Sequence, residues 1–217
     1  MTIECVTLET NHLFDGNPIA EQHKLRYRSI IQRQGWEVPT IRNLEFDQYD
    51  NPATTYLIWR DYNGIARGVS RLYPTDRPYM LKEVFPKLAE NVPLPSSVDI
   101  WEGTRFCVDK GLDAPLRKRI IQEIILGYLE YGLQAGIKKY VGIMLPIYWN
   151  NIFEKNGWKV SYWSDVITID NGDRIRSGEV EVSEENLALV RKKTGINESI
   201  INYGKYEGEY ANNRKAI

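Results

Sequence analysis

The segment Ile100–Val108 constrains the fold more than any other part of the chain. Its residues alternate between the two faces of a strand, and both faces are largely apolar. A strand that is apolar on both sides is typical of the centre of a sheet that other elements cover on both faces. One face nevertheless carries Glu102 and the other Arg105, with Gly103 between them as the predicted site of a β-bulge. This segment therefore predicts both a covered central strand and charges inside the protein.

Strands and helices alternate along the rest of the chain. Asn17 and Pro18 supply an N-cap and a first-turn proline for a helix that we expect to run to about Gln32. The other predicted elements are a long loop at Trp36–Asn51, a hairpin of strands Thr55–Arg60 and Ile65–Tyr73, a short helix at Leu81–Leu88, a long helix at Leu116–Ala135, a buried strand at Lys139–Leu145, a short helix at Tyr148–Lys155, one or two strands within Val160–Thr168 and a last helix capped by Ser183. This order predicts an α/β sandwich.

Charge and composition exclude several kinds of partner. The 28 Lys and Arg residues nearly cancel the 29 Asp and Glu residues, so we expect no nucleic acid, which needs a basic surface. The longest apolar stretch, Tyr140–Trp149, is too short to cross a bilayer, so we expect no membrane insertion. Cys5 and Cys107 form no ligand motif, which predicts no metal site and fits a cytoplasmic location. The length predicts one domain over residues 1–217, with a frayed tail over about 207–217.

Six charged residues fall in apolar settings or on the long loop. They are Arg26 in the first helix, Arg71 in the hairpin, Glu102 and Arg105 in the central strand, and Asp47 and Asp50 in the loop. A poorly solvated charge costs several kcal/mol unless it is paired, whereas a whole domain is stable by about 5 to 15 kcal/mol. We therefore expect three bases and three acids to form one neutral cluster. From spacing alone, a structural network and a binding site for a charged small molecule are equally supported.

Six short motifs occur in order between Leu25 and Trp158. They are Leu25-Arg26-Tyr27, Gly35-Trp36, Glu45-Phe46-Asp47-Gln48-Tyr49-Asp50, Arg71-Leu72-Tyr73-Pro74-Thr75, Met80 through Val84-Phe85-Pro86, and Trp101-Glu102-Gly103-Thr104-Arg105-Phe106. Together they resemble the motifs of acyl-homoserine lactone synthases, the LuxI-type autoinducer synthases. The resemblance implies a three-layer α/β sandwich similar to the Gcn5-related N-acetyltransferase fold, with a central twisted mixed sheet and helices on both faces.

The resemblance also implies a reaction with two bond-forming steps. The amino group of S-adenosylmethionine (SAM) would attack an acyl thioester to form an amide. The SAM carboxylate would then displace methylthioadenosine and close a lactone ring. The product would be an N-acyl-L-homoserine lactone, a quorum-sensing signal. Because SAM is a substrate in this scheme, no cofactor is expected.

The family's functional residues map onto the charged positions of this chain. The expected catalytic residues are Glu102, as the base that deprotonates the SAM ammonium, and Arg105. The expected SAM-binding residues are Arg26, Trp36, Asp47, Asp50 and Arg71. Two alternatives stay open: Glu102 as a purely structural ion pair, and Trp36 as a loop anchor rather than a stacking partner for the adenine or the sulfonium. A bulge at Gly103 would also leave backbone N–H groups for the thioester oxyanion.

Two departures from the family pattern bear on the acyl chain. Most members have Phe at the position of Ile30, and members that make 3-oxo products often have Thr in the strand that here contains Gly142 and Met144. We therefore expect an unsubstituted acyl chain. The predicted acyl pocket consists of Ile30, Phe85, Phe106, Ile143, Met144, Tyr148 and Trp149.

The expected acyl donor is an acyl-carrier protein. The chain lacks the Gln/Arg-x-x-Gly-x-Gly/Ala loop with which acetyltransferases of this fold hold the coenzyme A pyrophosphate. The basic triplet Arg117, Lys118 and Arg119 suits an acidic carrier protein, and an ordinary exposed helix start explains it equally well. Three alternatives remain: an acyl-CoA donor with a short branched or aryl group, an N-acyltransferase for a different amine, and a non-catalytic acyl-chain sensor.

Overall fold

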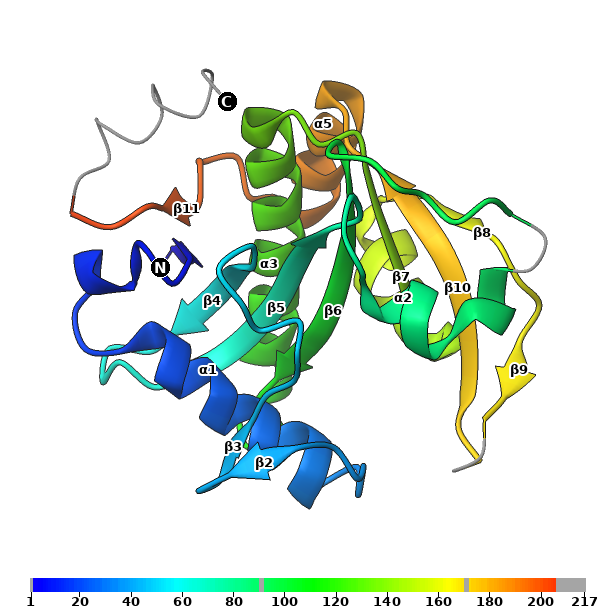
Figure 1. Ribbon diagram of the computed structural model, residues 1–217. Coiled ribbons are helices and arrows are strands. Elements are labelled where there is room, and N and C mark those ends of the chain that lie inside the picture. Colours follow the sequence, from blue (N-terminus) through cyan, green and yellow to red (C-terminus); the bar gives the residue numbers. More distant parts are fainter. Residues whose placement is uncertain (1, 90–91, 170–171, 206–217) are drawn as a thin grey trace. The chain divides into compact units, whose positions relative to one another are not determined.

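The computed structural model describes residues 2–89, 92–169 and 172–205 (Figure 1). These residues divide into two compact units. The first unit contains the described residues 2–72, 105–128 and 199–205, and the second contains the others. Strands β5 (Ala66–Pro74) and β6 (Ile100–Val108) and helix α3 (Ala114–Ala135) contribute residues to both units. The expected single domain stays a prediction, and its frayed tail over 207–217 lies outside the described residues.

The sheet of the first unit has the strand order β11, β1, β4, β5, β6. Its other strands are β1 (Ile3–Val6), β4 (Thr55–Arg60) and β11 (Ile201–Asn202). β1 pairs in parallel with β11 and antiparallel with β4, and β4 and β5 form the predicted hairpin. The hairpin turn closes because Asp61 Oδ1 accepts hydrogen bonds from the N–H groups of Asn63 and Ile65, while Gly64 adopts a φ of 76°.

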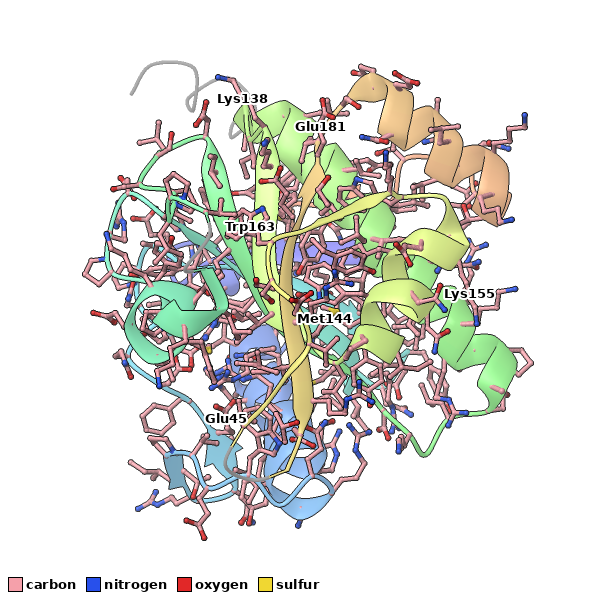
Figure 2. All side chains as sticks on the ribbon, turned by 90° about the vertical axis from the view of Figure 1, so that its right-hand side faces the viewer. Glu45, Lys138, Met144, Lys155, Trp163 and Glu181 are labelled. Atoms are coloured by element: carbon pink, nitrogen blue, oxygen red, sulfur yellow. The ribbon has the colours of Figure 1, made fainter. Side chains whose placement is uncertain are left out.

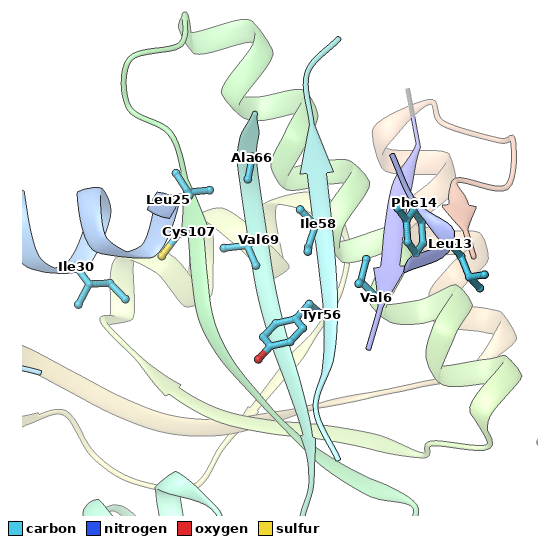
Figure 3. Packing of buried hydrophobic residues seen from close by; sticks show 10 residues of the cluster. All are labelled: Val6, Leu13, Phe14, Leu25, Ile30, Tyr56, Ile58, Ala66, Val69 and Cys107. Carbon is cyan, nitrogen blue, oxygen red and sulfur yellow. The ribbon is translucent and has the colours of Figure 1, made fainter. Parts of the chain in front are cut away.

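Helix α1 (Pro18–Arg26) and the π-helical turn η2 (Tyr27–Gln32) cover one face of this sheet. The Asn17 side chain caps α1 as predicted, because it accepts a 3.0 Å hydrogen bond from the Ala20 N–H. Figure 3 shows how side chains from these helices, from η1 (Asn11–Leu13) and its neighbour, and from the strands pack together: Val6, Leu13, Phe14, Leu25, Ile30, Tyr56, Ile58, Ala66, Val69 and Cys107.

Helix α3 covers the opposite face. Gly68 and Ser70 of β5 point to this face, because they alternate with Val69, which points to α1. A Cβ atom on Gly68 would stand 2.4 Å from Ile120 Cγ2, so only glycine allows the helix to lie this close. The hydroxyl groups of Ser70 and Tyr128 are hydrogen-bonded at 2.5 Å. The first unit is therefore a helix–sheet–helix sandwich, as predicted.

The sheet of the second unit has the order β6, β7, β10, β8. Strand β7 (Lys139–Met144) runs parallel to β6, whereas β10 (Arg174–Glu181) is antiparallel to β7. Strands β8 (Val160–Tyr162) and β9 (Ile167–Thr168) both pair antiparallel with β10. The helical elements of this unit are α2 (Met80–Val84), η3 (Pro86–Ala89), the end of α3, α4 (Pro146–Tyr148), η4 (Trp149–Phe153), η5 (Glu154–Asn156) and α5 (Glu184–Thr194). The parallel pair among antiparallel pairs confirms the mixed sheet.

Several elements differ from the prediction. Strands β10 and β11 were not predicted, and the long loop contains a small hairpin of β2 (Thr40–Ile41) and β3 (Leu44–Glu45). The two short predicted helices each divide into shorter helical turns. The last helix is confirmed, with the Ser183 side chain accepting from the Asn186 N–H and Gly195 at a φ of 74°. No helix in the described part of the chain is long and apolar enough to span a membrane.

Candidate functional site

Six charged side chains of the first unit form what we call the ion cluster. They are Arg26 at the end of α1, Glu45 on β3, Asp47 and Asp50 in the turn after β3, Arg71 on β5 and Arg105 on β6. Figure 2 labels Glu45 on its small hairpin. Three guanidinium groups meet three carboxylates, so the cluster is neutral overall. Its most exposed side chain is that of Arg105, at 11%.

Arg26 joins the helix to two acids. Its two Nη atoms donate parallel hydrogen bonds of 2.7 and 2.8 Å to the Asp50 carboxylate, and its Nε donates to Glu45. A bidentate arginine–carboxylate pair is among the strongest polar contacts in proteins. Arg26 and Glu45 are both completely buried. Arg26 is therefore fully occupied in holding the loop residues against α1.

Arg71 and Arg105 complete the cluster from the two strands. Arg71 Nη1 lies 2.5 Å from Asp47 Oδ1 and 3.1 Å from Asp50 Oδ2. Arg105 Nη2 lies 3.0 Å from Glu45 Oε1 and 2.7 Å from Asp47 Oδ2. Each carboxylate thus contacts two guanidinium groups, and the network has no separate ion pairs.

The Arg26–Asp50 pair of the cluster is held in its charged form by its partners. Burial alone would raise the pKa of Asp50, but the hydrogen bonds and charge of Arg26 and the charge of Arg71 hold it well below its usual range. Burial opposes the charge on Arg26, yet Asp50 and Glu45 raise its pKa above the ordinary value. Partners thus outweigh desolvation, as a buried charge network requires.

Neutral groups on α1 and β4 support the network. The Tyr56 hydroxyl donates to Asp50 Oδ1 at 2.8 Å, and burial and the Asp50 charge raise the Tyr56 pKa. His23 Nδ1 donates to the Glu45 carbonyl oxygen at 2.7 Å. Burial and the charge of Arg26 lower the His23 pKa below 6.5, which keeps the imidazole neutral. The backbone as well as the side chain of Glu45 is therefore anchored to α1.

Strand β6 has an irregular backbone at Arg105, and the predicted bulge at Gly103 stays a prediction. Arg105 has a φ of 54°, in the left-handed region that non-glycine residues rarely adopt. Buried positions alternate at Glu102 and Thr104, and the next buried position is Cys107, so the alternation changes phase at Arg105. The unusual backbone turns the Arg105 side chain into the ion cluster. Such conformations cost about 1 to 3 kcal/mol and concentrate at functional sites.

Glu45, which the sequence interpretation did not include among the site residues, is an acid of the cluster and links Arg26 to Arg105. The expected place of Glu102 in the cluster stays a prediction. Glu102 belongs to the second unit, where its carboxylate accepts hydrogen bonds from the N–H groups of Met80 at 3.1 Å and Leu81 at 2.6 Å. The sequence held a signal for Glu45, which lies two residues before Asp47. Two such residues share a face wherever the chain is extended.

The predicted acyl-pocket residues are divided between the units. Ile30 and Phe106 belong to the first and the other five to the second, so the pocket stays a prediction. Trp149 is a core residue of the second unit, where it packs on Phe153 and donates to the Arg176 carbonyl oxygen at 2.9 Å. Tyr148 is exposed, and Phe85, Ile143 and Met144 are partly buried.

Trp36 and the basic triplet have mixed surroundings. Trp36 packs, partly buried, against the apolar cluster of the first unit, as expected for a loop anchor, and its contact with SAM stays a prediction.

In the basic triplet, Arg119 Nε donates to Glu123 at 2.5 Å, and Glu123 also accepts from the Trp59 indole. Lys118 is exposed, and Arg117 contacts the Lys110 carbonyl oxygen. Within the described residues, no group of His, Cys, Asp and Glu could hold a metal ion.

Comparison with known proteins identifies relatives over most of the chain. A family model for autoinducer synthases matches residues 10–190. The isovaleryl-homoserine lactone synthase of Bradyrhizobium diazoefficiens is 29% identical over 199 residues, which are 89% of this chain and 86% of that protein. The acyl-homoserine-lactone synthase of Acinetobacter nosocomialis is 37% identical over 110 residues, or 46% of this chain and 60% of that protein. This chain therefore spans about 60% of the length of the Acinetobacter nosocomialis protein.

Solved structures resemble the chain in the same way. BjaI, a CoA-dependent acyl-homoserine lactone synthase solved with SAM and isopentyl-CoA, has a TM-score of 0.81 at 26% identity, covering 93% of this chain and 92% of that one. The acyl-homoserine lactone synthase LasI has a TM-score of 0.73 at 28% identity, covering 82% and 90%. A putative N-acetyltransferase from Lactobacillus plantarum shares only the fold, with a TM-score of 0.53 at 13% identity over 84% of this chain and all of that one. The predicted acetyltransferase-like fold is confirmed.

Proposed function

The chain belongs to the autoinducer synthase family, and on this premise we propose that it makes an N-acyl-homoserine lactone from SAM and an acyl thioester. In the first step a base takes a proton from the SAM ammonium, and the freed amine attacks the thioester carbonyl. The thiol leaves and an amide forms. In the second step the SAM carboxylate attacks Cγ, the C–S bond breaks, methylthioadenosine leaves and the lactone ring closes.

The observation that carries this proposal is the neutral, preorganised ion cluster of the first unit. The reacting end of SAM bears an ammonium, a sulfonium and a carboxylate. A site that already holds alternating opposite charges can receive such a molecule without first reorganising its own dipoles. Arg105 is the most exposed member, so we assign it the contact with the SAM carboxylate. Arg26 and Arg71 then act by holding Asp50 and Asp47 in place.

Glu102 remains our candidate for the base, acting directly or through water. Its carboxylate accepts two backbone hydrogen bonds, from the N–H groups of Met80 and Leu81. Hydrogen bonds to a carboxylate favour its ionised form, which is the form that a base needs.

For the acyl donor, we propose a short branched acyl-CoA in preference to an acyl-carrier protein. Two observations support this choice over the expectation from the sequence. The relatives that match along nearly the whole chain include an isovaleryl-homoserine lactone synthase and a CoA-dependent synthase. In addition, Arg119 of the basic triplet is paired with Glu123 and so is less available to an acidic partner.

The experiment is an assay of the purified chain with SAM and either isovaleryl-CoA or isovaleryl-carrier protein. We expect mass spectrometry to detect isovaleryl-homoserine lactone and methylthioadenosine in equal amounts, with faster turnover of the CoA donor. Acylation of another amine without release of methylthioadenosine would instead support the N-acyltransferase alternative. Binding of acyl-CoA without any product would support the acyl-chain sensor.

A further inference from the structure

Glu102 connects strand β6 to the first turn of helix α2. The first N–H groups of a helix have no partner within the helix, and here two of them point at one carboxylate. Glu102 Oε2 accepts from the Met80 N–H and Oε1 from the Leu81 N–H, and the side chain is 1% exposed. Tyr79, the N-cap residue, makes no side-chain capping hydrogen bond. The Glu102 carboxylate on β6 therefore accepts the N-terminal hydrogen bonds of α2 that an N-cap side chain would otherwise accept.

The position of the segment formed by α2 and η3 depends on hydrogen bonds to other elements of the second unit. A helix of five residues is too short to be stable by itself. Several of its side chains face solvent, including Lys82, Glu83 and Val84. At the other end of the segment, Ser177 Oγ on β10 donates a hydrogen bond to the Leu88 carbonyl oxygen. Two buried polar contacts, from Glu102 and from Ser177, thus hold the segment at its two ends.

Phe85 lies at the C-terminal end of α2, between the residues that Glu102 and Ser177 contact. It is partly buried and is a predicted wall of the acyl pocket. Glu102→Gln replaces one acceptor oxygen with an NH₂ group that only donates, so it removes one of the two hydrogen bonds that Glu102 accepts from α2. The position of Phe85 is then less well defined.

We propose that Glu102 is a positioning residue for the acyl donor, acting through the α2–η3 segment, in addition to its role as the base. This inference rests on the proposed function. Ser177 has the same positioning role at the other end of the segment without any part in proton transfer.

Ser177→Ala separates positioning from chemistry, because it loosens the segment while leaving Glu102 unchanged. We expect the KM for isovaleryl-CoA to rise by about tenfold, with the KM for SAM and the pH profile of kcat unchanged, since a lost buried hydrogen bond costs about 1 to 1.5 kcal/mol. Ser161→Ala, on an exposed position of β8, is the matched control and should leave both KM values unchanged. An unaltered KM for isovaleryl-CoA in Ser177→Ala would overturn the proposal.

Amide hydrogen exchange of Glu102→Gln supplies a second test that needs no activity. We expect the Met80 and Leu81 amides to exchange at least tenfold faster than in the unchanged chain, with Glu83→Gln as the control on the exposed side of α2. Unchanged exchange would show that Glu102 does not hold α2. If the unchanged chain makes no lactone but these amides still depend on Glu102, the proposed function fails while the tie itself stands.

Discussion

Arg26 and Asp50 form a bidentate ion pair inside the first unit, with hydrogen bonds of 2.7 and 2.8 Å between a guanidinium that is fully buried and a carboxylate that is almost so. Asp50→Asn would leave Arg26 and Arg71 with too few negative partners. Because removing one partner of a buried pair costs about 3 to 5 kcal/mol, we expect the free energy of unfolding to fall by about that amount in urea denaturation. Asp76→Asn breaks the exposed pair with Arg77 and should cost less than about 1 kcal/mol.

The stability of the chain should decrease as the pH falls from 7 to 5. The folded state lowers the pKa of His23 below 6.5, so the unfolded state binds more protons in this range. By linkage, a lowered folded pKa stabilises the protein above the unfolded pKa and loses that effect as the pH falls. His23→Asn should flatten the dependence of the unfolding free energy on pH, whereas replacement of the exposed His12 by Asn should leave it unchanged. Equal slopes in both variants would contradict the assignment to His23.

Glu45→Gln tests the acid that the sequence interpretation missed. The amide would keep the shape of Glu45 but remove the charge that Arg26 and Arg105 share. We expect a loss of at least 3 kcal/mol in the free energy of unfolding and at least tenfold weaker SAM binding by calorimetry. The exposed Glu37→Gln is the control. Normal SAM affinity in Glu45→Gln would remove this residue from the site.

Arg105→Met tests the assigned contact with the substrate carboxylate. The methionine keeps most of the side-chain volume but no donor, so SAM affinity should fall by at least tenfold. Arg67→Met removes a guanidinium that pairs with Asp61 and Asp109 outside the ion cluster, and it should bind SAM normally. If both variants bind SAM equally well, Arg105 serves only to hold Glu45 and Asp47.

Gly68→Ala tests the close packing of α3 on the sheet. The added Cβ would stand 2.4 Å from Ile120 Cγ2, so the helix must shift. Overpacking of this kind costs about 1 to 3 kcal/mol, which thermal denaturation would show as a lower midpoint. At Gly111 the nearest atom to an added Cβ is the end of the Asp109 side chain, at 3.3 Å, so Gly111→Ala should be tolerated.

Local signals in the sequence determined most of the elements. Asn17 and Pro18 begin α1, the Asp61–Gly64 turn closes the hairpin, and Ser183 and Gly195 bound the last helix. Each of these capping and turn signals acts over a few residues, so it can be recognised without knowing the rest of the fold. Strand β10 was missed because charges occupy much of it, and its strand character is secured by neighbours on both sides.

The spacing of apolar residues was also enough to predict that Arg26, Arg71 and Arg105 need acidic partners, because unpaired charges in apolar surroundings are too costly. Which acids pair with them could be seen only once the chain was folded. Glu45 is 60 residues from Arg105 along the chain, yet its carboxylate accepts a hydrogen bond from the Arg105 guanidinium. Glu102, only three residues from Arg105, accepts hydrogen bonds from the first N–H groups of α2. Pairing depends on distances in space that packing sets, and the turn of the backbone at Arg105 selects the direction of its side chain.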